Sequence, residues 1–223
     1  GIFALVGAGI AASSASGSLS SSFTALMAFV SVLVIGLLTH ALWQFVAVII
    51  LSKQSPWEII KKSVPIFSTA FATSSSIATL PAAMYSADNL KADPAVTRFM
   101  LPLCSSVNVG GMMMYEVAAA LFFSQVLGVD LTLSQQILIA LASILGGMAE
   151  GGIPETSLVS LVVVFRIVNI PLSAISILLP LDRIIDRLRT MVNVFGNVCG
   201  VIIVSHFLRE KNSQSDDASR EYL

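Results

Sequence analysis

Five ionisable side chains lie in a segment that is otherwise as apolar as a membrane span. Residues 182–193 read Asp-Arg-Ile-Ile-Asp-Arg-Leu-Arg-Thr-Met-Val-Asn, whereas residues 170–181 and 198–204 carry no charge. Five ionisable groups facing lipid near the bilayer centre would cost on the order of 12–17 kcal/mol. We therefore expect these charges to face protein, one another or water.

Acids, amides and one arginine of this segment share a face if the segment is helical. At about 100° per residue, a stripe roughly 80° wide holds Asp182, Asp186, Arg189, Asn193 and Asn197. One interpretation is a set of internal ion pairs that brace helices, either Asp182 with Arg183 or Asp186 with Arg189. A binding site for a charged solute fits the mixture of acids, amides and arginine better.

The composition of the chain indicates a membrane protein rather than a soluble domain. Hydrophobic residues make up 56% of the 223 residues and charged residues only 11%, and the mean hydropathy is strongly positive. The net charge of −1 gives no basic field for a nucleic acid partner. The two cysteines, Cys104 and Cys199, lie in apolar runs and suggest neither a disulfide framework nor a zinc site.

Two apolar segments are interrupted by residues that disfavour a continuous helix. The centre of residues 63–85 is Thr-Ser-Ser-Ser followed by a proline, and a glycine-rich cluster ending in proline fills positions 146–154 of the segment 134–168. Small hydroxyl residues compete for backbone hydrogen bonds, and proline removes a donor. Paired interruptions of this kind point to a transporter whose site lies between inverted repeats. We expect two re-entrant helical hairpins, hairpin one and hairpin two.

Two further apolar segments are long enough to cross the hydrocarbon core. Residues 23–51 contain one ionisable side chain, His40, whereas residues 99–127 are interrupted at Asn108-Val109-Gly110-Gly111 and carry Glu116. An unwound helix exposes carbonyl groups that can ligate a cation. A lone carboxylate in a span is a functional candidate. The alternative for Glu116 is a neutral acid that is hydrogen-bonded to a neighbour.

Four motifs carry a resemblance to a known family. They are Phe-Ala-Thr-Ser-Ser-Ser-Ile-Ala-Thr-Leu-Pro at 71–81, Asn-x-x-Gly at 108–111 with Tyr115, Gly-Gly-Ile-Pro at 151–154, and Asp-Arg-Leu-Arg-Thr-Met-Val-Asn-Val at 186–194. In order and spacing they resemble the dicarboxylate/amino acid:cation symporter family, which includes the excitatory amino acid transporters. The resemblance implies an all-α polytopic membrane protein, with a transport domain of two re-entrant helical hairpins and broken transmembrane helices.

The resemblance also implies three regions: a partial scaffold with one full span at 1–52, a transport core at 53–208, and a disordered cytoplasmic tail at 209–223. The core should contain hairpin one at 63–85, a broken helix at 94–127, hairpin two at 134–168 and a polar helix at 172–208. The parent protein would be a homotrimer that crosses the plasma (inner) membrane several times. The family's N-terminal helices have no counterpart here, so we expect this chain to be part of a longer protein and not to transport alone.

By position, Arg189 resembles the arginine that pairs with the side-chain carboxylate of an acidic substrate, and Asp186 resembles the acid that receives its amino group. Thr190 and Asn193 match polar positions that contact the substrate. The elements that enclose the α-carboxylate are matched by Ser75, Ser76, Ala149, Gly151 and Gly152. Hairpin two resembles the extracellular gate, which a glycine-rich tip suits.

The coupling ion is expected to be Na⁺ or H⁺, and no cofactor is expected. Glu116 matches the family's proton-carrying glutamate. The cation-coupling set is Ser106, Asn108, Glu116, Asn193 and Asn197, with a candidate sodium site at Asn108, Asn193 and Asn197. Two acids that the family places at cation sites are replaced here by Gly110 and Asn197, and an amide oxygen lacks the full charge that offsets ion dehydration.

The sequence thus predicts a secondary active symporter of acidic amino acids or dicarboxylates that works by alternating access and is coupled to a cation. Asp186 favours an amino acid, because a plain dicarboxylate has no amine. The alternative is a non-transporting remnant or a structural membrane protein derived from such a transporter. An enzyme is disfavoured, since the hairpin segments contain no Ser/His or Cys/His pair and no cluster of metal ligands.

Overall fold

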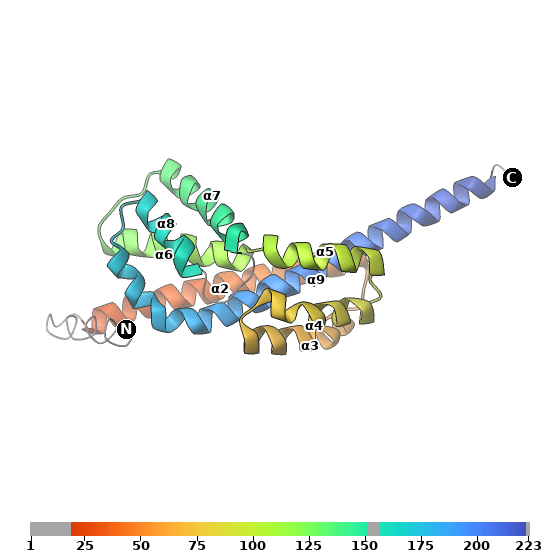
Figure 1. Ribbon diagram of the computed structural model, residues 1–223, viewed down its shortest axis with the longest axis horizontal. Coiled ribbons are helices and arrows are strands. Elements are labelled where there is room, and N and C mark those ends of the chain that lie inside the picture. Colours follow the sequence, from red (N-terminus) through yellow and green to blue (C-terminus); the bar gives the residue numbers. More distant parts are fainter. Residues whose placement is uncertain (1–18, 151–156, 222–223) are drawn as a thin grey trace. The chain divides into compact units, whose positions relative to one another are not determined.

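The computed structural model describes residues 19–150 and 157–221, and within these ranges it is built of helices with no strand (Figure 1). The predicted all-α class is therefore confirmed for the described residues. In chain order the elements are α2 (Leu19–Ser52), α3 (Pro56–Thr73), α4 (Ser76–Asn89), α5 (Pro94–Val107), α6 (Gly110–Val126), α7 (Leu133–Glu150), α8 (Ser157–Ile167), the 3₁₀ turn η1 (Leu172–Ala174) and α9 (Ile175–Glu221).

Among the described residues, three stretches are long and apolar enough to cross a membrane: Thr24–Ser52, Pro94–Val126 and Leu172–Asn212. The second of them comprises α5 and α6, which are separated by Asn108 and Val109. Two shorter apolar helices lie at Leu133–Ala149 and Ser157–Ile167. About twenty apolar residues suffice to span the hydrocarbon core, so the chain belongs in a membrane.

The chain forms two compact units. The first unit comprises residues 1–39 and 109–189, and the second comprises residues 40–108 and 190–223. The chain passes between them within α2, at the break between α5 and α6, and within α9.

The first unit is organised around α6, α7 and α8, and the last two lie side by side (Figure 1). A Cβ atom added at Gly146 would lie 2.9 Å from Ser160 Cβ, and one at Gly147 would lie 2.7 Å from Val109 Cγ2. These two glycines therefore allow neighbouring side chains to approach α7 closely. That packing explains a difference from the sequence-based expectation: the interruption was placed from residue 146 onward, but α7 remains helical through Gly146 and Gly147 to Glu150.

In the second unit, α3 and α4 lie side by side and are joined at two serines (Figure 1). Ser74 ends α3 in the left-handed conformation (φ 51°, ψ 28°), and its N–H donates to Ala70 O at 2.9 Å. Ser75 is the N-cap of α4, where its Oγ accepts from the N–H of Ala78 at 3.2 Å. This break lies within the Thr73–Ser76 interruption of the sequence, and the two helices extend beyond the expected 63–85 at both ends.

Apolar side chains of α2, α3, α4, α5 and α9 form the core of the second unit, which includes Val48, Ile59, Ile66, Leu101, Phe195 and Ile202. Phe67 and Phe195 pack ring against ring, with centroids 5.4 Å apart. This core holds the second half of α9 against α3 and α5, and so fixes the residues of α9 that face the break after α5.

The C-terminal helix differs from expectation at both ends. It begins at Ile175 after the turn η1 instead of at residue 172, and it continues to Glu221 where a disordered tail at 209–223 was expected. Polar contacts hold its turn at residues 206–210: the Lys53 ammonium lies 3.0 Å from Glu210 Oε1, and Arg209 donates to Lys91 O. Since adding residues to an existing helix is far easier than starting one, the anchored helix extends into polar sequence.

Candidate functional site

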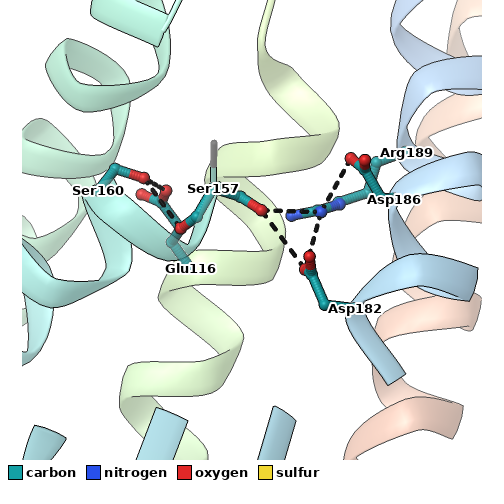
Figure 2. Close-up of polar contacts among 6 residues, drawn as sticks. All are labelled: Glu116, Ser157, Ser160, Asp182, Asp186 and Arg189. Carbon is teal, nitrogen blue, oxygen red and sulfur yellow. Dashed lines mark hydrogen bonds and ion pairs between the residues drawn. The ribbon is translucent and has the colours of Figure 1, made fainter. Parts of the chain in front are cut away.

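Arg189 lies on α9 in the first unit, with 1% of its surface exposed. Its Nη2 donates to Asp182 Oδ1 at 3.0 Å, to Asp186 Oδ1 at 3.0 Å and to Ser157 Oγ of α8 at 3.1 Å (Figure 2). Asp182 and Asp186 precede Arg189 by about two turns and one turn of α9. We call Asp182, Asp186 and Arg189 the charged centre. Its Asp186–Arg189 pair is one of the two ion pairs considered from the sequence.

The face of the guanidinium is covered by an aromatic ring. Arg189 Cζ lies 4.2 Å from the ring centroid of Tyr115, a buried residue of α6. A cation over an aromatic face gains roughly 0.5–2 kcal/mol, more where water is excluded. Tyr115 therefore helps to fix the plane of the guanidinium, which also fixes the direction of its unused donors.

Those unused donors are the most informative feature of the charged centre. Among the described residues, Arg189 Nε and Nη1 have no acceptor, so three of the five guanidinium N–H groups are unpaired there. A buried donor without an acceptor costs roughly 1–3 kcal/mol, and more when it is charged. The hydrogen bonds to Asp182, Asp186 and Ser157 therefore use Nη2 of Arg189, and Nε and Nη1 are available to an oxyanion.

The two acids of the charged centre differ in exposure. The side chain of Asp182 is 2% exposed and that of Asp186 is 15% exposed. Asp182 also accepts from Ser157 Oγ at 3.4 Å, so it is tied to a second helix. Asp186 is the more accessible carboxylate, and the better placed of the two to receive a solute. Arg183 and Arg187 of the same helix have exposed side chains.

Glu116 of α6 is connected to the charged centre through two serines of α8. It is fully buried, and Ser160 Oγ donates to its Oε1 (Figure 2). The same hydroxyl lies 3.2 Å from Ser157 O, and Ser157 Oγ in turn contacts Arg189 and Asp182. Glu116 is thus hydrogen-bonded to a neighbour on another helix. A polar chain runs from it to Arg189.

The sequence analysis missed Ser157 and Ser160 and gave Asp182 no role of its own. The serines stand three residues apart on an otherwise apolar helix, a spacing that puts both on one face. That pattern is visible in the sequence, but nothing local shows which helix the face meets.

In the second unit, the three residues of the candidate sodium site do lie together. Asn108 Nδ2 donates to Asn193 O at 3.1 Å and to Asn197 Oδ1 at 2.7 Å. Asn193 and Asn197 are 8% and 2% exposed. We call Asn108, Asn193 and Asn197 the amide centre. Ser106 is half-buried on α5 of the same unit, whereas Gly110 begins α6 in the first unit.

The other predicted substrate contacts are distributed over both units. Ser75, Ser76 and Thr190 are buried in the second unit, where Ser75 O also accepts from Thr79 Oγ1 at 2.7 Å. Ala149 is exposed near the end of α7 in the first unit, and Gly151 and Gly152 lie outside the described residues. The structure therefore brings Arg189 together with Asp186, and Asn108 with Asn193 and Asn197. Within the described ranges, acids, histidines and cysteines form no group able to hold a metal ion.

The chain is similar in sequence to known transport proteins. The sequence model of the sodium:dicarboxylate symporter family matches residues 1–207. A Caenorhabditis elegans protein provisionally named sodium-dependent excitatory amino acid transporter is 35% identical over 191 residues, which cover 83% of this chain and 38% of that protein. Excitatory amino acid transporter 1 of Ambystoma tigrinum is 37% identical over 187 residues, covering 83% of this chain and 34% of that protein. The human protein of the same name is 35% identical over 185 residues, with 82% and 34% covered. The chain thus spans little more than a third of the length of these relatives.

Proposed function

This chain belongs to the sodium:dicarboxylate symporter family, and from that premise we propose that the complete polypeptide is a secondary active symporter of acidic amino acids such as glutamate and aspartate. Transport would proceed by alternating access. The names of the relatives support a substrate of this class. The chain spans 34–38% of their length, so activity is assigned to the complete polypeptide and not to this portion.

The observation that carries the proposal is the buried guanidinium of Arg189 with unpaired Nε and Nη1 groups. A planar guanidinium binds a carboxylate through two parallel hydrogen bonds, which a lysine cannot do. Arg189 would receive the side-chain carboxylate of the substrate on these donors, while Asp182 and Ser157 keep Nη2 in place. The site would then recognise an anion without losing the protein contacts that position the arginine.

Asp186 is the proposed acceptor for the substrate's amino group. It is the more exposed acid of the charged centre, and its Oδ1 already faces a cationic partner, Arg189. An ammonium group beside Asp186 would balance the second carboxylate of the charged centre once the substrate's carboxylate shares the charge of Arg189. A dicarboxylate without an amine would bring negative charge near Asp186 and no positive group, so an amino acid is favoured over a plain dicarboxylate.

Coupling to a cation follows from the charge of the first unit's polar chain. Glu116, Asp182 and Asp186 supply three carboxyl groups against the single guanidinium of Arg189. Excess negative charge in an apolar interior is costly, so a proton on Glu116 would stabilise the loaded site. We propose H⁺ coupling at Glu116, whose carboxyl group accepts a hydrogen bond from Ser160 Oγ. The sodium-dependent name of a relative supports Na⁺ as a coupling ion as well.

Further properties are proposed from family membership alone. They are a gate formed by residues 134–168, substrate contacts at Thr190, Asn193, Ser75, Ser76, Ala149, Gly151 and Gly152, a homotrimeric assembly and a place in the plasma membrane. Each would have to be established on the complete polypeptide.

The test is uptake of labelled glutamate and aspartate by the complete polypeptide in proteoliposomes, with an inward proton gradient in one set and an inward sodium gradient in another. Wild type is compared with Glu116→Gln and Arg189→Ala, and Arg183→Ala is the control on an exposed arginine of the same helix. We expect Arg189→Ala to abolish uptake under both gradients, and Glu116→Gln to abolish the proton-driven part. Proton-driven uptake that survives in Glu116→Gln would refute the proton assignment. Absence of uptake in wild type would favour the non-transporting alternative.

A further inference from the structure

The amide centre of the second unit has the geometry of a cation site in which an amino group takes the place of the ion. Two oxygen atoms, Asn193 O and Asn197 Oδ1, converge on the single nitrogen Asn108 Nδ2. Carbonyl and carboxylate oxygens are the ligands that hard cations use. An amide NH₂ group offers two donors and carries the positive end of the amide dipole. It therefore meets both oxygens with hydrogen bonds where a cation would meet them by coordination.

The approach of this amino group to α9 depends on a glycine. A Cβ atom built at Gly196 would lie 2.6 Å from Gln44 Nε2 and 3.2 Å from Asn108 Nδ2. Two carboxamide groups thus pack directly against the backbone of α9 at a residue without a side chain. Gln44 Nε2 is in turn 2.9 Å from His40 Nε2. A second carboxamide, Gln44, and the imidazole hydrogen-bonded to it thus lie next to the amide centre.

We propose that the amino group of Asn108 takes the place of a cation in the amide centre, and that its hydrogen bond to Asn197 keeps this centre from binding sodium. A cation entering here would have to break both hydrogen bonds of Asn108 and turn its amide. It would then meet only neutral dipoles in exchange for its water shell, because all three residues of the amide centre are uncharged. Sodium coupling by the complete polypeptide, which is part of the function proposed above, would use other ligands.

A second observation predicts that replacing Asn197 by aspartate would allow the amide centre to bind sodium. Asn197 Nδ2 is buried and has no acceptor among the described residues. In Asn197→Asp an oxygen replaces that nitrogen. One carboxylate oxygen can still accept from Asn108, while the other adds a ligand and a full negative charge. The amide centre of the variant should therefore bind sodium, which that of the wild type does not.

The experiment measures the melting temperature of the substrate-free complete polypeptide in detergent, in sodium chloride and in choline chloride at equal ionic strength. Wild type is compared with Asn197→Asp and Asn197→Ala. The matched control is Asn89→Asp, which changes an exposed asparagine at the end of α4 in the same unit. Because no substrate is present, a failure of the uptake experiment and a failure of this inference remain distinguishable.

We expect Asn197→Asp to gain a sodium-dependent rise of roughly 5 °C beyond the wild-type response when sodium is about 100-fold above its Kd. Asn197→Ala and Asn89→Asp should keep the wild-type response to sodium. The inference is overturned if wild type shows a sodium-dependent rise that Asn197→Ala loses and Asn89→Asp keeps. It is also overturned if Asn197→Asp folds and gains nothing. If Asn197→Asp does not fold, the comparison of wild type with Asn197→Ala still decides.

Discussion

The charged centre of the first unit and the amide centre of the second unit are built to the same plan from different chemistry. In each, one side-chain nitrogen donates to oxygen atoms of α9: Arg189 Nη2 to Asp182 and Asp186, and Asn108 Nδ2 to Asn193 and Asn197. In each, a partner comes from another element, α8 or the break after α5. They differ in charge, since the first joins ions and the second joins neutral groups.

That difference determines what each centre can exchange. In an ion pair that is buried away from water, each charge needs a partner of opposite charge. A charged solute can therefore displace one member of the pair only if it carries the same charge as that member. The charged centre also has unpaired guanidinium donors among the described residues, which a solute carboxylate would fill. The amide centre satisfies its oxygens with hydrogen bonds and has no charge to compensate. One polar helix thus carries an ion-paired centre whose arginine has donors without an acceptor among the described residues, and a neutral centre whose oxygens accept hydrogen bonds.

The largest expected effect comes from removing the cation of the charged centre. Arg189→Met removes the cation that pairs with the buried Asp182 and the half-buried Asp186, and breaking a buried pair in this way costs about 3–5 kcal/mol. Thermal or chemical unfolding of the complete polypeptide in detergent measures the loss. Arg183→Met, on the exposed side of the same helix, is the control and should change stability little.

A triple variant sharpens that prediction. Arg189→Met with Asp182→Asn and Asp186→Asn removes all three charges, so it should recover much of the stability that Arg189→Met alone loses. If the triple variant is no more stable than Arg189→Met, uncompensated charge is not the cause of the loss, and packing of the arginine side chain against Tyr115 would be the better explanation.

The two acids of the charged centre should differ in how much stability is lost when each is replaced by asparagine, and both losses should be smaller than that of Arg189→Met. Asp182→Asn should lower stability by about 1–3 kcal/mol, because this side chain is 2% exposed and is held by both Arg189 and Ser157. Asp186→Asn should cost less stability, since this side chain is 15% exposed. Asp186→Asn should instead raise the KM for glutamate. The KM for a dicarboxylate without an amine should stay nearly unchanged. Equal KM changes for the two substrates would contradict the role of Asp186 as amine acceptor.

Helix interruptions could be read from the sequence where their cause is local. Ser74 and Ser75 end one helix and cap the next with their own backbone and side-chain groups, and Asn108 stands in the break between α5 and α6. The same holds for the polar stripe of α9, since a period of 3.6 residues fixes which of its side chains share a face. The Asp186–Arg189 pair, one turn apart on α9, follows directly from that stripe.

The remaining differences arise from tertiary contacts. Gly146 and Gly147 look like helix breakers, but in α7 they are positions where Ser160 and Val109 approach, and only the packing of helices reveals that use. Ser157 and Ser160 acquire a role because α8 carries them to Arg189 and Glu116. The tail after residue 208 was expected to be disordered because its composition is polar, whereas contacts of Arg209 and Glu210 continue α9 into it.

The smallest expected effect is the loss of the neutral donor of the amide centre. Asn108→Ala leaves Asn193 O and Asn197 Oδ1 without that donor, and we expect a loss of about 1–2 kcal/mol, as for other uncharged hydrogen bonds. Asn108→Asp should cost more, because its carboxylate would face two oxygen atoms and repel them, and added sodium should relieve part of that cost. The measurement is unfolding with and without sodium at equal ionic strength. A loss for Asn108→Ala as large as that for Arg189→Met would mean that charge is not what distinguishes the two centres.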